Sequence, residues 1–196
     1  MITFVTLFAV YVVSSIVSMF LTSTPIELFT IAGVPIWMPL SALTLVPLVD
    51  VMRSFTQDAA EKIGITFKKT ASLMLSISLA VAFLCVLFAG LPLPIFVGVL
   101  AAVTVGGAAD ILVFRKMGQW FKNPVVRMAF SNFAATIVGS GIVFFVAFTD
   151  IFFAGNVMAR PMNEVVVGWF AQSTFIWAAS IVLGSAIQSV KKVFVK

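Results

Sequence analysis

The sequence predicts an all-α integral membrane protein, a single bundle of about six transmembrane helices. Hydrophobic residues make up 62% of the chain and charged residues 10%, so there are too few polar side chains to coat a soluble globule. Apolar runs long enough to cross a bilayer recur along the chain. The basic residues gather in alternate loops between these runs, which is the pattern that the positive-inside rule describes.

The apolar runs predict each span in order, because a helix that crosses the bilayer needs about 20 mostly apolar residues. Residues 2–21 are expected to be a retained helix, since they lack the basic start and small-residue cleavage site of a signal peptide. Residues 36–52 carry Pro39 and Pro47, so this span is expected to bend. The remaining spans are expected at 70–89, 95–114, 126–148 and 164–190.

The loops carry the charge. Residues 53–69 form the longest charged loop, in which Asp58 and Glu61 indicate a short surface helix ending at Gly64. Numbering the loops alternately places Arg160 alone on one side, and the other eleven of the twelve Lys and Arg on the opposite side. These eleven are Arg53, Lys62, Lys68, Lys69, Arg115, Lys116, Lys122, Arg127, Lys191, Lys192 and Lys196. We therefore expect a multi-pass protein of the cell inner membrane with both termini in the cytoplasm.

Composition also excludes several functions. The basic pI near 9.7 follows from topology and contact with anionic lipid headgroups, so no nucleic-acid partner is expected. The lone Cys85 permits neither a disulfide framework nor a cysteine metal site, and the absence of His excludes His-based metal sites and triads. We expect no cofactor and no enzymatic activity, because the motifs for aspartyl chemistry are missing. Residues 1–196 are expected to form one domain.

Polar residues inside the spans are the candidates for a binding site. An ionisable residue in a span costs about 2.5–3.5 kcal/mol on insertion scales, so it normally faces a cavity or a partner. Asp50 and Asp110 lie near the ends of two spans that run toward the cytoplasm. Ser131 and Asn132 lie about 6 residues, or roughly 9 Å, inside the same face, and Gln188 returns to a similar depth. This layer suits a polar, hydrogen-bonding ligand.

A simpler interpretation needs no ligand. Carboxylates near the end of a span reach the membrane surface cheaply, so Asp50 would pair with Arg53, and Asp110 with Arg115 or Lys116. The small residues of the fifth span are better explained by close helix packing, and these are Ser131, Ala135 and Gly139.

The last span adds a polar stripe along one helical face, made of Ser173, Trp177, Ser180, Gly184 and Gln188. Trp177 lies near mid-membrane, away from the interface where tryptophan is usual. Its ring would either stack on a flat heterocycle or fill the bundle core. Gln172 lies on a neighbouring face and is a weaker candidate for the site.

Several segments together resemble one transporter family. Residues 109–114 (Ala-Asp-Ile-Leu-Val-Phe), a basic loop, Ser131-Asn132 and Phe144 are similar to the vitamin uptake transporter family, which includes the bacterial queuosine precursor transporters. The resemblance covers residues 36–148 with scattered matches, and implies uptake of 7-deazaguanine bases such as preQ0 or preQ1. The chain departs from the family at Gly107 and Gly139, where relatives often carry acids.

The leading hypothesis is a transporter that imports a small planar heterocycle. Asp110 and Asn132 would bind its polar edge, Asp50 would supply charge or a proton site, and Trp177 would stack on it. The runner-up is the substrate-binding subunit of an energy-coupling-factor vitamin importer, which would co-purify with ATPase and scaffold subunits. A structural or assembly membrane protein is the alternative of another class. The expected partners are a small-molecule substrate and the lipid bilayer, with a homo-oligomer or energy-coupling subunits left open.

Overall fold

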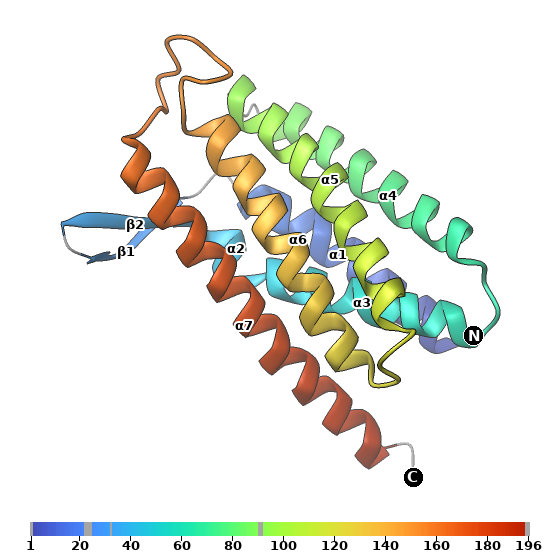
Figure 1. The fold of residues 1–196 in the computed structure, drawn as a ribbon. Helices are drawn as coiled ribbons and strands as arrows, with labels where there is room; N and C mark the ends of the chain where they lie inside the picture. The colour runs from blue at the N-terminus through green and yellow to red at the C-terminus, as the bar shows by residue number, and fades with distance from the viewer. Residues whose placement is uncertain (1, 22–24, 32, 90–91, 195–196) are drawn as a thin grey trace.

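The computed structural model is an elongated helical bundle with one small hairpin, and it describes residues 2–21, 25–31, 33–89 and 92–194 (Figure 1). Among these residues, four helices are long and apolar enough to cross a membrane, and α1 contains a shorter apolar stretch, Phe4–Ser18. The helical, membrane-type architecture therefore agrees with the prediction. The elements are α1 (Ile2–Leu21), β1 (Pro25–Ile31), β2 (Val34–Pro39), α2 (Leu40–Thr44), α3 (Val46–Lys62), α4 (Phe67–Ala89), α5 (Leu93–Met117), α6 (Pro124–Ala147) and α7 (Met162–Phe194).

The predicted second span, 36–52, is not a continuous helix. Its first residues form β2, which pairs antiparallel with β1 across a turn where Gly33 has φ of 81°. The chain then continues through the short α2 into α3. Proline explains the division, because Pro35 and Pro39 lack the N–H that a helix needs and favour extended backbone before them. The all-α prediction is corrected at this hairpin, which projects from the bundle beside α7 (Figure 1).

The helix α3 is polar and yet buried. We expected residues 53–69 to form a surface loop with a short helix, but α3 runs to Lys62 and residues 54–60 are buried. The predicted stop is confirmed, since the helix ends just before Gly64, whose φ is 77°. The helix packs against α1, α6 and α7, so a row of polar side chains passes through an otherwise apolar bundle.

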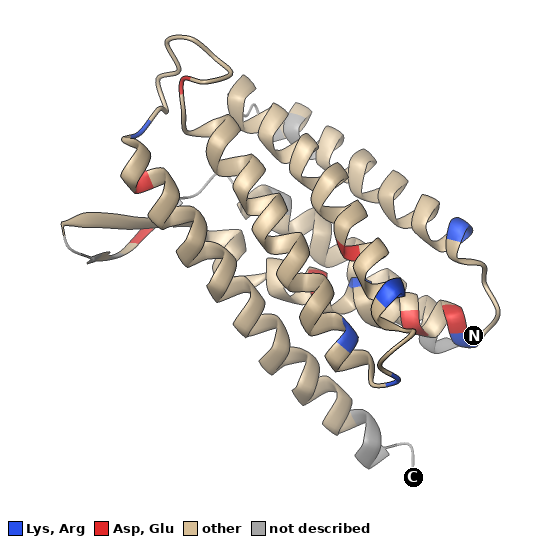
Figure 2. Cartoon of the chain, in the orientation of Figure 1, with Lys and Arg blue, Asp and Glu red and all other residues tan. Residues whose placement is uncertain are grey.

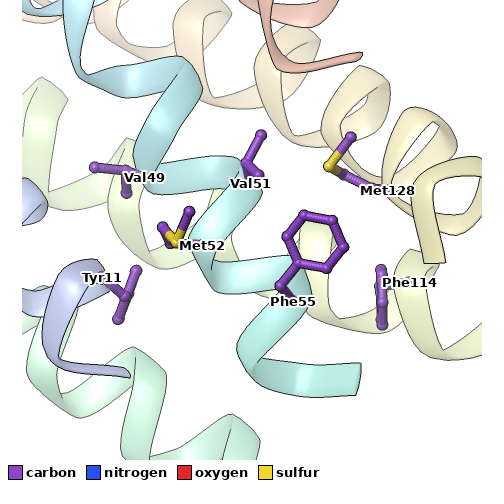
Figure 3. Packing of buried hydrophobic residues seen from close by; sticks show 7 residues of the cluster. All are labelled: Tyr11, Val49, Val51, Met52, Phe55, Phe114 and Met128. Carbon is purple, nitrogen blue, oxygen red and sulfur yellow. The ribbon is translucent and has the colours of Figure 1, made fainter. Parts of the chain in front are cut away.

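Two features hold the bundle around α3. A cluster of buried residues from α1, α3, α5 and α6 includes Tyr11, Phe55, Phe114 and Met128 (Figure 3). Helices α5 and α6 approach so closely that a methyl group on Gly106 would lie 3.0 Å from the backbone of α6. This close contact, at Ala135 and Gly139, agrees with the predicted packing role of the small residues.

Charge divides the bundle into two ends (Figure 2). We call the basic end the one where α3 and α5 finish and α4 and α6 begin, because basic residues flank all four of these points. We call the loop end the opposite one, formed by residues 148–161 between α6 and α7. Lys196 lies outside the described residues, and the side chains of Lys191 and Lys192 are not described either.

Candidate functional site

Arg53 lies between two buried carboxylates in the middle of the bundle. Its Nη1 donates a hydrogen bond to Oδ2 of Asp110 at 3.3 Å and lies 3.7 Å from Oδ1 of Asp50. Asp110 is fully buried and Asp50 is 6% exposed. The ion pair of Asp50 with Arg53 that the simpler interpretation predicts is therefore present. Asp110, however, pairs with the same arginine in the interior, while Arg115 and Lys116 are exposed.

Buried polar atoms without partners lie on α5 and α6 at about the level of this ion pair. Neither amide atom of Asn132 has a hydrogen-bond partner among the described residues, and neither does Oδ1 of Asp110. Asp110 follows Gly106 by one turn of α5, and Ser131 precedes the contact of Gly106 with α6 by one turn of α6. Because α5 and α6 run antiparallel, these two residues lie at the same level of the bundle. An unpaired buried polar group costs about 1–3 kcal/mol, and a bound polar molecule would recover that free energy.

A cavity of about 160 Å³ opens onto the same region. Asp50 and Arg53 of α3 line it, together with Gln172 of α7. The Nε2 of Gln172 donates a hydrogen bond to Oγ of Ser140 at 3.2 Å, while its Oε1 has no partner among the described residues. Gln172, the weaker candidate in the sequence, therefore lines the cavity and carries a buried acceptor atom without a partner among the described residues. We call this space, an open pocket between α3, α5, α6 and α7, the inner cavity.

Three predicted residues are buried beside the inner cavity without lining it, and these are Asp110, Ser131 and Asn132. Asp110 reaches the cavity through its hydrogen bond to Arg53, which does line it. Ser131 donates its hydroxyl to the carbonyl of Met128 at 3.3 Å. Arg53 therefore links the two acidic residues of the predicted polar layer.

The two candidates on the distal part of α7 lie elsewhere. Trp177 donates its indole N–H to the carbonyl of Ala129 at 2.9 Å, and its ring packs edge-on against Phe133 at 5.5 Å. Trp177 therefore joins α7 to α6 and lines neither cavity. Gln188 is partly exposed and lines neither cavity described here.

Arg127 forms a second ion-pair cluster that the sequence analysis did not anticipate. Its guanidinium is buried, lies 3.0 Å from both carboxylate oxygens of Glu61 and 3.7 Å from Asp58, and stacks 4.0 Å over the ring of Phe114. Its Nε donates to the carbonyl of Phe114 at 3.3 Å. This cluster ties α3, α5 and α6 together at the basic end. The signal that could have found it is the acidic spacing of Asp58 and Glu61 on one helical face.

A larger cavity, of about 450 Å³, lies at the loop end and is called the outer cavity here. Its walls are apolar, with Phe144, Phe148 and Met158 among the lining residues. Arg160 and Trp37 also line it, with the guanidinium 4.9 Å from the indole ring. The indole N–H of Trp37 has no hydrogen-bond partner within the described part of the chain. The outer cavity therefore combines aromatic walls with polar donors.

The chemistry of the site is that of recognition by hydrogen bonds and charge. Within the described ranges, no group of three or more His, Cys, Asp or Glu side chains is placed to hold a metal ion. The inner cavity offers guanidinium donors, a carboxylate and an amide, which suit a solute with both donors and acceptors. Comparisons with protein-family models, with curated proteins and with solved structures yield no match to this chain.

Proposed function

We propose that this protein is a membrane transporter that imports a small planar heterocycle, with the 7-deazaguanine bases preQ0 and preQ1 as the leading substrates. The observation that carries the proposal is the buried layer of Asp50, Arg53, Asp110 and Asn132 beside a cavity within an apolar bundle. Charged and amide groups are expensive in such surroundings and mark solute pathways in membrane proteins.

The size and chemistry of the inner cavity support a substrate of this class. At about 160 Å³ it is smaller than the roughly 300–1,000 Å³ of ordinary ligand pockets, which favours a single small ring system. A purine-like edge carries alternating donors and acceptors, and these match the donors of Arg53 and the free acceptor of Gln172. The resemblance of residues 109–114, Ser131-Asn132 and Phe144 to queuosine precursor transporters supports the same choice of substrate.

We further propose that the chain crosses the cell inner membrane six times with its basic end in the cytoplasm, and that α2 and α3 together make the crossing that was expected at residues 36–52. The proposal rests on the positive-inside rule and on the gathering of basic residues at one end of the bundle (Figure 2). Substrate would then enter at the loop end and leave at the basic end.

Uptake in cells tests the function. Cells unable to make queuosine precursors would express this chain, and accumulation of labelled preQ0 and preQ1 would be measured against cells with an empty vector. We expect accumulation of at least one base, and a strong reduction in Gln172→Leu, which removes both hydrogen-bonding atoms from the cavity. The matched control is Gln119→Leu, an exposed glutamine in the turn after α5, which is expected to transport normally. Equal accumulation with the empty vector, at confirmed membrane expression, would contradict the proposal.

A further inference from the structure

The two cavities lie end to end along the seam between α6 and α7. Phe144 and Gly168 line the outer cavity, whereas Ser140 and Gln172 line the inner one. On each helix the two lining residues are four positions apart, which is about one helical turn, or roughly 6 Å along the axis. The cavities are therefore separated along this seam by a single turn of each helix.

One aromatic ring fills that separation. The ring of Phe144 lies directly on Gly168, so that a methyl group at Gly168 would come within 2.6 Å of Cε1 of Phe144. Phe144 is 6% exposed, and its ring also packs against Phe148 at 5.5 Å between centroids. Below the ring, the seam is polar, since Gln172 bonds to Ser140. Along this seam, the apolar contact of Phe144 with Gly168 therefore lies between the aromatic outer cavity and the polar inner one.

The outer cavity has the chemistry of an entrance for the solute proposed above. Its walls hold Phe148 and Trp37, whose aromatic rings suit a flat solute, and the buried indole N–H of Trp37 has no hydrogen-bond partner among the residues that the structure describes. The charge of Arg160 at the loop end is also partly neutralised, because its Nη1 lies 3.5 Å from Oε2 of Glu164 on the same rim. A flat solute held there would lie one helical turn from Gln172 and the ion pair of Arg53.

From these placements we infer that the outer cavity is the first binding site on the solute's route, and that Phe144 seated on Gly168 is the gate to the inner cavity. The inference rests on the proposed transport function and assigns its entry path. The ring of Phe144 can occupy its seat only because residue 168 is glycine, since a side chain at that position would fill the space that the ring takes. Rotation of this one ring away from Gly168 would then open the route without separating α6 from α7.

Accessibility of a cysteine in the inner cavity tests the gate without any substrate. In a Cys85→Ser background, Ser140→Cys would be labelled with a membrane-impermeant thiol reagent, in intact cells and in inverted vesicles. Val157→Cys, at a position 96% exposed in the loop, identifies the face to which the loop end belongs. Phe144→Ala is expected to speed labelling at position 140 from that face by about tenfold or more, which corresponds to roughly 1.4 kcal/mol in the opening equilibrium.

Two further variants distinguish a specific role of Phe144 from a general loosening of the bundle. Gly168→Ala displaces the ring rather than deleting it, and is expected to raise labelling in the same direction. Phe145→Ala removes the neighbouring ring, which packs against Trp169 and lines neither cavity, so labelling should stay at the starting rate. Unchanged labelling in both Phe144→Ala and Gly168→Ala, or an equal rise in Phe145→Ala, would overturn the inference. Because no substrate is added, failure here is distinguishable from a failure to take up preQ0 or preQ1.

Discussion

Replacing Arg53 by methionine is expected to destabilise the folded protein by about 3–5 kcal/mol, because it leaves the carboxylates of two buried aspartates without their cation. The magnitude follows from the burial of the partners. Asp110 is fully buried, Asp50 is 6% exposed, and Nη1 of Arg53 lies 3.3 and 3.7 Å from their oxygens. Methionine keeps most of the length and the apolar contacts of the arginine stem, so loss of packing contributes little.

Equilibrium unfolding in mixed detergent micelles, followed by tryptophan fluorescence, measures this free energy. The matched control is Arg160→Met, which breaks a 3.5 Å pair with Glu164 at a position 39% exposed and should change stability by about 0–1 kcal/mol. Adding Asp110→Asn to Arg53→Met should recover part of the loss, since it removes one uncompensated charge. Equal destabilisation by Arg53→Met and Arg160→Met, or a further loss of stability when Asp110→Asn is added to Arg53→Met, would show that Arg53 is not the shared cation of two buried carboxylates.

Three further results are expected from detergent-purified variants. Arg127→Ala should lower the free energy of unfolding by about 3–5 kcal/mol, because it leaves buried carboxylates without their cation. Lys122→Ala, at an exposed position in the same loop region, should lower it by less than about 1 kcal/mol, and equal losses would contradict the buried cluster. Trp177→Phe should cost about 0.5–1.5 kcal/mol of stability, because it removes the hydrogen bond from the indole to Ala129. Substrate affinity per folded molecule should stay unchanged, and a fall in affinity in a binding titration would show that Trp177 contacts the substrate. Gly106→Ala should destabilise by about 1–3 kcal/mol in thermal unfolding, because its methyl would lie 3.0 Å from the backbone of α6; a neutral result would contradict the close helix contact.

The sequence predicts the helical membrane architecture well, and the reasons are physical. Apolar runs of bilayer length have few alternatives to a helix, and five predicted spans correspond to α1, α4, α5, α6 and α7. The second span was wrong because hydropathy does not distinguish an apolar strand from an apolar helix. The prolines at 35 and 39 carried the deciding signal, and they are compatible with either a kink or extended backbone until the pairing of β1 with β2 is known.

At the candidate site, too, the features set within one helix could be predicted from the sequence, whereas those set by packing between helices could not. Depth along the helices predicted that Asp50 and Asp110 would lie at one level, where both contact Arg53, because helical rise converts sequence position into height. Rotation about the helix axis and the path of α3 are set by packing, so the sequence placed Arg53 and Arg127 in loops and ranked Trp177 above Gln172. The charge rule treats every arginine as a topological signal and cannot identify those that are buried between carboxylates.

Uptake by the purified chain, alone in liposomes, is the most direct test of whether this protein transports queuosine precursors. Protein would be reconstituted at matched density as the unaltered chain and as Gln172→Leu, and uptake of labelled preQ0 and preQ1 would be followed against protein-free liposomes. We expect saturable uptake of at least one base by the unaltered chain, and a large reduction in Gln172→Leu, whose side chain lines the inner cavity. Uptake by the unaltered chain no faster than in protein-free liposomes, with binding of neither base, would contradict the account.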